Sequence, residues 1–278
     1  MSIKEESAKL FALASSIRRV IPDASMSHLD TLPGVRVYVQ DAARIGRVLG
    51  ARRAKVLDWG CGYGQMSWLL ARRGYEVTAA DLAGGHFDCS PLLDGVAWFP
   101  HDHPSHLDVP DAVFDAVVAS GTLEHVADPA ASLREVGRIL KPGGSLFIFR
   151  FPNLHSLIEA CIRAAGLWHH NVRMTRRELA FFLRCGGFEV LNTAYETLLP
   201  VNCMTVQSLR PLRAKVDPVM TLLDRTLVRL PLVSRLSTSI RATARRSDEY
   251  YGLLPAVTAG VPANRTARRA SRWRICDR

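Results

Sequence analysis

The sequence has no long uncharged apolar run and no start typical of an exported protein. None of its segments reaches the about 18 uncharged apolar residues that a membrane-spanning helix requires. Residues 1–21 contain Glu5 and Glu6 and lack a continuous apolar core, so no secretory signal peptide is expected. We therefore expect a cytoplasmic protein, with peripheral attachment to the inner face of a membrane as the alternative.

Paired cysteines are also lacking. The six cysteines include no Cys-x-x-Cys pair, which argues against a zinc site and favours reduced thiols. Three histidines, His101, His103 and His106, lie close together, but they occupy a proline-containing stretch without a regular helical or strand face. We expect surface imidazoles there, and we expect no metal cofactor.

The first 200 residues have no excess of charge. They contain 21 Lys and Arg against 21 Asp and Glu, whereas residues 201–278 contain 15 against 5 and carry the whole net charge of +10. The basic character therefore belongs to the C-terminal segment. Its arginines lack interleaved aromatic residues and any recognisable nucleic-acid module, so nucleic acid is not an expected partner.

The most informative stretch is VLDWGCGYG, residues 56–64, in which an apolar strand leads through Asp58 into a glycine-rich turn. A helix is expected over 65–73, and a second strand, in residues 76–81, ends at Asp81. This strand–turn–helix–strand unit places its polar residues at the carboxyl ends of strands, where open α/β sheets bind their ligands.

The glycine spacing distinguishes two kinds of ligand. A dinucleotide site has the pattern G-x-G-x-x-G with a pyrophosphate on the helix N-terminus, whereas Gly60, Gly62 and Gly64 form G-x-G-x-G. The carboxylate of Asp58 would repel a pyrophosphate, but it suits a ligand that carries an ammonium and a sulfonium group. Asp81 suits a ribose diol in either case.

With its acid and its G-C-G-x-G pattern, this stretch resembles motif I of the class I S-adenosylmethionine (SAM) dependent methyltransferases. SGTLEHV at 120–126 resembles motif IV in the branch with Glu-His-Val, and LKPGG at 140–144 before an expected strand is a further family hallmark. Phe-Pro-Asn at 151–153, a later histidine and a Thr-containing helix that leads into Gly-Phe are similar to O-methyltransferases of glycans, lipid-linked intermediates and polyprenyl quinones.

The resemblance implies a Rossmann-like class I methyltransferase fold, an α/β fold with a largely parallel sheet and helices on both faces. Residues 1–50 are expected to form an N-terminal helical cap, with one helix over 3–21 and another that Asp41 caps. The SAM-binding domain is expected over 51–200. The sequence does not locate the antiparallel seventh strand that is usual in this fold.

A basic, amphipathic, α-helical appendage is expected over 201–250, followed by a basic tail over 251–278. An apolar stripe at helical spacing runs from Val216 to Leu230, and a weaker amphipathic stretch passes through Leu236 and Ile240 and ends in RATARRS. The appendage is either a lid or extra layer on the domain, or a segment, residues 210–246, that contacts an anionic membrane surface.

The resemblance also implies roles for residues at the strand ends. Asp58, Gly60 and Gly62 would line the methionine end of SAM, and Asp81 would bind the ribose hydroxyls. Asp102 with its neighbour His103 would lie beside the adenine. The full set expected at the cofactor is Asp58, Gly60, Cys61, Gly62, Tyr63, Gln65, Asp81, Leu82, Asp102, His103, Ser120 and Gly121.

His125 is the candidate general base, because an imidazole with a pKa near neutrality suits removal of a hydroxyl proton. The alternative is a histidine that only hydrogen-bonds the fold or SAM. Acceptor contacts are expected at Glu124, Asn153, His169 and His170.

The sequence thus predicts a SAM-dependent methyltransferase that O-methylates a small-molecule, glycan or lipid-linked acceptor and releases S-adenosylhomocysteine. One alternative is a peripheral membrane enzyme that methylates a polyprenyl quinone or a similar lipid. Another is a non-catalytic SAM-binding or scaffold protein.

Overall fold

The computed structural model describes residues 2–20, 27–29, 31–51, 53–83, 90–101, 105–166, 170, 172–199 and 210–248 of the chain, without the side chains of 18–20, 27 and 210–218. Three residues predicted at the site, Asp102, His103 and His169, lie outside these ranges. The tail over 251–278 does so as well.

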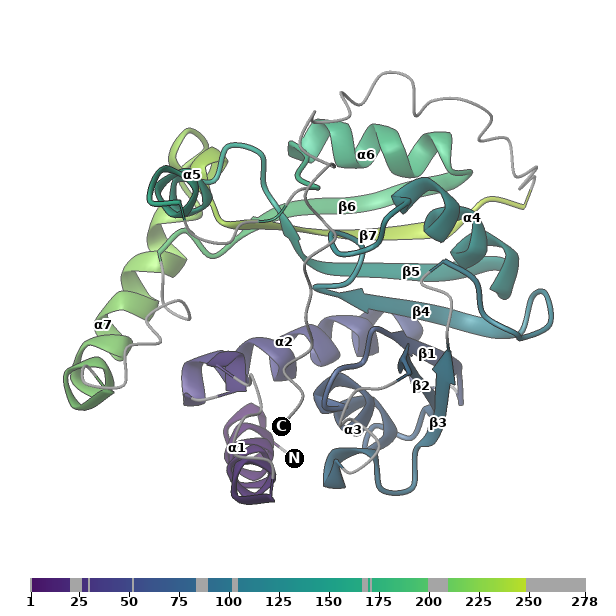
Figure 1. Cartoon of the computed structure of the whole chain (residues 1–278), viewed down its shortest axis with the longest axis horizontal. Helices are drawn as coiled ribbons and strands as arrows, with labels where there is room; N and C mark the ends of the chain where they lie inside the picture. The colour runs from purple at the N-terminus through teal and green to yellow at the C-terminus, as the bar shows by residue number, and fades with distance from the viewer. Residues whose placement is uncertain are drawn as a thin grey trace.

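The chain folds around one seven-stranded sheet with helices on both faces (Figure 1). The helices are α1 (Ile3–Val20), α2 (Leu32–Leu49), α3 (Gln65–Ala71), α4 (Pro129–Ile139), α5 (Leu157–Ala164), α6 (Arg176–Cys185) and α7 (Arg210–Leu227). Short 3₁₀ turns are η1 (Ser27–Leu29), η3 (Pro91–Leu93) and η5 (Val233–Leu236). The strands are β1 (Lys55–Trp59), β2 (Glu76–Leu82), β3 (Ala97–His101), β4 (Phe114–Ser120), β5 (Leu140–Pro152), β6 (Phe188–Glu196) and β7 (Ser239–Arg246).

The strand order is β3-β2-β1-β4-β5-β7-β6, with β7 antiparallel to both neighbours and the first five strands parallel. Neighbouring residues of a strand enter opposite cores, because side chains alternate across a sheet. Val118 packs with α1, α2 and α3 on one face, whereas Val117 packs with α4 and α6 on the other. This arrangement confirms the predicted Rossmann-like fold.

The seventh strand lies where the sequence predicts a continuation of the helical appendage. Residues Ser239–Arg246 form β7, which is inserted between β5 and β6. Ile240, Ala242 and Ala244 are buried, and Arg241, Thr243 and Arg245 alternate with them. This period of two is that of a strand, so the prediction is wrong for this stretch, and the sheet draws on residues beyond 200. The helix predicted from the apolar stripe between Val216 and Leu230 is present as α7, which ends at Leu227.

The second helix starts earlier than predicted. Thr31 caps it by accepting a hydrogen bond from the Gly34 amide at 3.2 Å, with Pro33 in the first turn. Asp41 therefore lies inside α2 and is not its cap. Its carboxylate is fully buried and accepts hydrogen bonds from the guanidinium groups of Arg44 at 2.5 Å and Arg150 at 2.6 Å.

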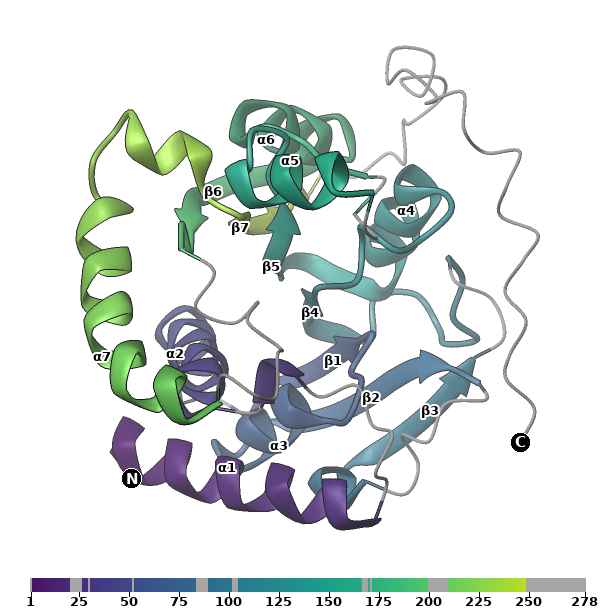
Figure 2. The same cartoon turned by 60° about the vertical axis from the view of Figure 1, so that its left-hand side comes forward.

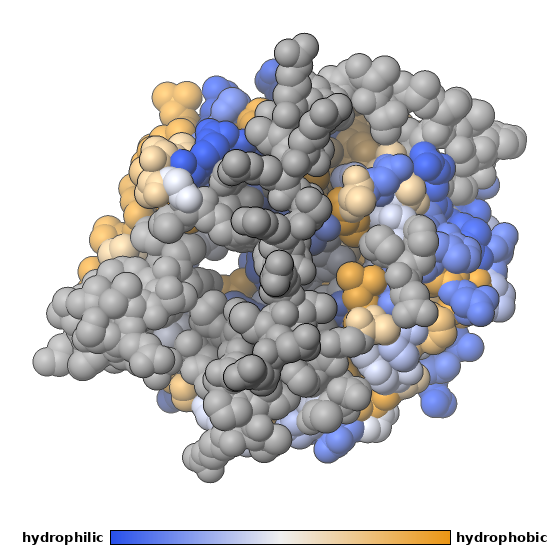
Figure 3. Space-filling model, viewed as in Figure 1, coloured by the Kyte–Doolittle hydropathy of each residue, from blue (hydrophilic) through white to orange (hydrophobic). Residues whose placement is uncertain are grey.

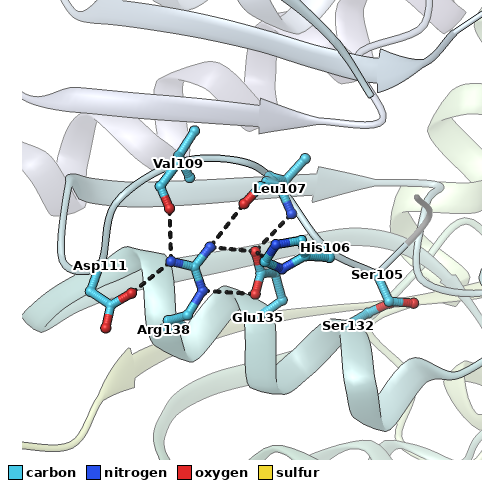
Figure 4. A network of polar contacts seen from close by, with 8 residues as sticks. All are labelled: Ser105, His106, Leu107, Val109, Asp111, Ser132, Glu135 and Arg138. Atoms are coloured by element: carbon cyan, nitrogen blue, oxygen red, sulfur yellow. Dashed lines mark hydrogen bonds and ion pairs between the residues drawn. The ribbon is translucent and has the colours of Figure 1, made fainter. Parts of the chain in front are cut away.

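An arginine of α4 holds the chain that leads from the predicted adenine-binding segment into β4 (Figure 4). Arg138 donates to Glu135, to Asp111 and to the carbonyls of Leu107 and Val109 at 2.6–2.9 Å. Glu135 in turn accepts from the Leu107 amide at 2.8 Å. Loop and helix are thereby fixed as one unit.

Two of the three clustered histidines lie in the described part of the chain. His106 is exposed, as predicted, with its Nδ1 3.3 Å from Glu135. The prediction of a surface imidazole is wrong for His101, which is only 7% exposed at the end of β3. The strand continues further than the sequence indicates and turns this side chain inward.

None of the helices within the described ranges combines the length and apolar content that a membrane crossing needs.

Candidate active site

The glycine turn after β1 is held by neighbouring strand ends. The amides of Gly60 and Cys61 donate to the Ala80 carbonyl of β2 at 2.8 and 3.1 Å. Gly60 has φ +70°, and a Cβ at this position would lie 2.4 Å from the Thr122 hydroxyl oxygen. That hydroxyl donates to the Trp59 carbonyl at 3.0 Å. Only glycine therefore fits here, which explains the first position of the G-x-G pattern.

Two carboxylates flank this turn, as the sequence predicts. Asp58 is 1% exposed, and it accepts a hydrogen bond from the Ser67 hydroxyl at 2.6 Å. Burial raises the pKa of Asp58 to about 6, against the effect of Ser67. Asp81, at the end of β2, accepts from the amides of Gly62 and Leu82, both at 2.8 Å. A nearby cation would stabilise ionised Asp58.

Two further residues predicted at the cofactor have unused polar atoms. Gln65 Oε1 and Ser120 Oγ are buried, and neither has a hydrogen-bond partner among the residues that the structure describes. They lie at the start of α3 and the end of β4, on either side of the glycine turn. Because buried polar atoms in native proteins are nearly always satisfied, these two atoms fit a polar ligand in the site.

The remaining cofactor candidates in the described chain differ in exposure. Leu82 is an exposed apolar side chain next to Asp81, and Gly121 has φ +70° directly after β4. Cys61 is buried, and burial raises the pKa of its thiol, so the side chain is neutral. The Tyr63 ring packs partly buried against the core, and its carbonyl accepts a hydrogen bond from the Ser90 hydroxyl at 2.6 Å.

The loop after β4 brings three predicted residues together. Glu124 is 6% exposed, and its Oε1 lies 3.9 Å from Nε2 of the half-exposed His125. The rings of His125 and His170 lie 5.3 Å apart. Nδ1 of His170 is 2.7 Å from Oε1 of Glu159, a residue of α5 that the sequence gave no reason to select.

The charge states of this cluster suit proton transfer. Burial raises the pKa of Glu124 to about 7, although the charges of His170 and Arg150 oppose the rise. Burial and the charge of His170 lower the pKa of His125 from its ordinary value of 6.5. At pH 7 His125 is therefore mainly unprotonated and can accept a proton. Glu124, His125 and His170 also place their ligand atoms within 4.8 Å of one another, so the prediction that no metal takes part stays a prediction.

Asn153 has a different place from the predicted one. Its side chain is fully buried and donates to the carbonyls of Arg235 at 2.8 Å and Ser237 at 2.7 Å. These bonds join the end of β5 to the segment before β7. The structure therefore gives Asn153 a role in fastening the chain and leaves it no surface for an acceptor.

Sequence reasoning missed Arg150, at the carboxyl end of β5. Its guanidinium lies over the Tyr38 ring at 3.9 Å and binds Asp41, and its Nε and Nη2 are buried without a partner in the described chain. The stretch FIFRFP, residues 147–152, has the apolar pattern of an ordinary buried strand. Nothing local in it indicates that this arginine faces α2.

Comparison with known proteins agrees with this geometry. A family profile described as a methyltransferase domain matches residues 57–148. An uncharacterised methyltransferase of Mycobacterium tuberculosis is 31% identical over 196 residues, which are 67% of this chain and 86% of the relative. A ubiquinone biosynthesis O-methyltransferase of Xanthomonas campestris is 42% identical over 191 residues, which are 60% of this chain and 74% of the relative.

A solved structure has the same fold. The 1,6-didemethyltoxoflavin-N1-methyltransferase of Burkholderia thailandensis, with bound S-adenosylhomocysteine, superimposes with a TM-score of 0.51 at 20% identity and covers 89% of this chain and 92% of its own. Sheet order, site and relatives together define a methyltransferase. The chain belongs to the class I SAM-dependent methyltransferases, which sets aside the non-catalytic alternative.

Proposed function

We propose that this enzyme transfers the methyl group of SAM to a hydroxyl of its acceptor, with His125 as the general base. The observation that carries the proposal is the cluster that Glu124 and His125, in the loop after β4, form with His170, together with the burial that lowers the pKa of His125 and favours its unprotonated form. The Xanthomonas relative is named an O-methyltransferase, which supports the same acceptor atom.

The strand ends have the donors and acceptors that SAM requires. In this proposal Asp81 binds the ribose hydroxyls, Asp58 faces the cationic methionine end, and the unused atoms of Gln65 and Ser120 bind its polar groups. Gly62, with open space where a Cβ would stand, lets the ligand lie against the backbone. Asp102 and His103 are proposed beside the adenine from the sequence alone.

The protein's share of the chemistry is alignment and proton removal. Bound SAM supplies a methyl group that is already activated for displacement, so positioning the acceptor accounts for most of the rate. As the acceptor oxygen forms its bond to the methyl carbon and the carbon–sulfur bond breaks, His125 takes the hydroxyl proton. His170, held by Glu159 at 2.7 Å, keeps the His125 ring in place.

The test uses SAM labelled in its methyl group and a panel of phenols, glycosides and polyprenyl-linked sugars. Label found on an acceptor oxygen by mass spectrometry would support the proposal, and label on nitrogen or carbon would contradict it. His170→Gln serves as the comparison for His125→Ala, because it should slow turnover without removing the base.

A second acceptor class is a lipid at a membrane surface, and apolar side chains of the appendage favour it. Exposed apolar residues gather on α7 and on the turn that follows it, and Leu222 and Leu232 are 67% and 74% exposed. Figure 3 shows hydrophobic surface along the edge where α5, η5 and the end of α7 lie in Figure 1. The set is Val219, Leu222, Leu223, Leu230, Leu232 and Leu236.

Point variants test this alternative better than truncation, because a chain that ends before α7 would also lose β7 from the sheet. Leu222→Glu with Leu232→Glu should weaken sedimentation with phosphatidylglycerol vesicles about tenfold or more, since a fully buried leucine contributes about 1.5–3 kcal/mol. Val48→Glu, at an exposed apolar site on α2, is the control. Equal vesicle binding by all three proteins, or none by the unmodified chain, would contradict membrane contact.

A further inference from the structure

A large cavity lies beside the sheet, outside the residues assigned to SAM. It has a volume of about 850 Å³ and is bounded by α2, the start of α6, the end of β6, α7 and η5. Figure 2 shows α7 on the same side of the sheet as α2, beyond the end of β6. The appendage, to which the sequence assigns no single role, thus forms part of the cavity wall.

The wall of this cavity is strongly basic. Its acidic lining residues are Glu196 and Asp224, whereas seven arginines line it. Like charges gathered around one cavity repel one another, and an anion bound between them removes that cost. The arginines are Arg36, Arg44, Arg176, Arg225, Arg229, Arg235 and Arg241.

The two acids already have hydrogen-bond or ion-pair partners, and within the described chain only Glu196 pairs with an arginine of the wall, Arg241. Asp224 accepts hydrogen bonds from the amides of Leu198 and Leu199 at 2.6 and 2.7 Å. Glu196 accepts from the Arg150 amide at 3.2 Å and lies 3.6 Å from Nη1 of Arg241. Neither acid neutralises the whole wall.

Several guanidinium groups of the wall remain available. Arg36, Arg229 and Arg235 form no side-chain ion pair within the part of the chain that the structure describes. Arg176 is stacked on the Tyr195 ring at 5.0 Å, which orients its planar group. Guanidinium groups bind both carboxylate and phosphate oxygens in pairs of parallel hydrogen bonds. Because several guanidinium groups line this wall, it matches the larger negative charge of phosphate or pyrophosphate better than that of a single carboxylate.

The cavity adjoins the catalytic edge of the sheet through Arg150. This residue directly follows Phe149, which pairs with Ser120 of β4, and its charge acts on the Glu124 carboxyl. It also binds Asp41, which holds Arg44 of the cavity wall. Because β6 runs in the same direction as β4, the end of β6 in the cavity wall and the loop that carries His125 lie at the same edge of the sheet.

We propose that this cavity binds a phosphate or pyrophosphate group of the methyl acceptor and so selects phosphorylated acceptors. The inference rests on the proposed function, since it assigns the cavity to the acceptor of that reaction. Phosphate oxygens could also come from the headgroup of an anionic lipid, and the experiment separates the two sources.

The experiment titrates the full chain with inorganic pyrophosphate by calorimetry and repeats the titration on Arg36→Gln with Arg229→Gln. Loss of two guanidinium partners should weaken binding at least about tenfold. Arg184→Gln, on the exposed face of α6, should bind like the unmodified chain. Thermal unfolding of each variant shows whether the fold is kept.

Absence of pyrophosphate binding by the unmodified chain, or equal loss in the Arg184→Gln control, would overturn the proposal. So would binding to phosphatidylglycerol vesicles that the double variant abolishes while free pyrophosphate does not bind, because the headgroup would then be the source. A parallel titration with SAM separates the two proposals: retained SAM binding with no pyrophosphate binding refutes the cavity assignment alone.

Discussion

Gly60 and Gly62 offer a matched pair of substitutions that separates a packing role from a ligand-binding role. Both have left-handed backbone angles, φ +70° and +54°, which cost an alanine about 1–2 kcal/mol. Gly60→Ala must also displace Thr122 and break its hydrogen bond to Trp59, about 1 kcal/mol more. Gly62→Ala meets nothing within 4 Å in the described chain. We expect losses in unfolding free energy of about 2–3 and 1–2 kcal/mol.

SAM affinity should follow a different order from stability. In our account the open space at Gly62 is where the cofactor approaches the backbone, so Gly62→Ala should weaken SAM binding more than its small stability loss implies. Urea unfolding gives the first quantity and calorimetric titration the second. A Gly62→Ala protein with the SAM affinity of the unmodified chain and a larger stability loss than Gly60→Ala would refute this reasoning.

Three further predictions follow from other contacts. His125→Ala should abolish turnover and leave SAM affinity nearly unchanged; turnover like that of the unmodified enzyme would remove His125 from catalysis. As the pH is lowered, activity should persist below pH 6.5 and be lost only when the pH falls through the lowered pKa of His125, because protonated His125 cannot act as a base. A loss of activity that is already complete above pH 6.5 would contradict this. Arg138→Met should cost about 2–3 kcal/mol in urea unfolding at pH 7, because it leaves Glu135 buried without its cation. Burial would raise the pKa of Glu135, but its hydrogen bonds and ion pair with Arg138 lower it below 4.5. The loss of unfolding free energy in Arg138→Met should therefore shrink as the pH falls through that lowered pKa, because protonated Glu135 no longer needs the cation.

The sequence predicts those parts of the molecule that depend on short-range patterns. The strand into Asp58, the glycine turn and the strand ending at Asp81 are contiguous, and each residue's backbone preference agrees with its place in the fold. Helix caps are equally local: Asp128 caps α4, and Thr175 with Glu178 forms a capping box on α6. The strand–turn–helix–strand unit is present where the sequence places it.

Features set by long-range packing could not be predicted in the same way. Around Ile240, buried and more exposed residues alternate in a segment whose composition also fits a basic amphipathic helix. It forms a strand because β5 and β6 both pair with it. The pairing of Asp41 with Arg150 joins residues that are distant in sequence. Asn153 has a polar side chain of a kind common in binding sites. Only the fold shows that its side-chain amide donates its hydrogen bonds to the carbonyls of Arg235 and Ser237.

The most direct test of the account is calorimetric titration of the purified chain with SAM and with S-adenosylhomocysteine, repeated on Asp81→Ala. Asp81 lies at the end of β2 with its carboxylate turned to the Gly62 amide, where we place the ribose. We predict that the unmodified chain binds both ligands and that the substitution weakens binding about tenfold or more, which corresponds to about 1.4 kcal/mol. No binding by the unmodified chain, or equal affinity in Asp81→Ala, would contradict the proposed cofactor site.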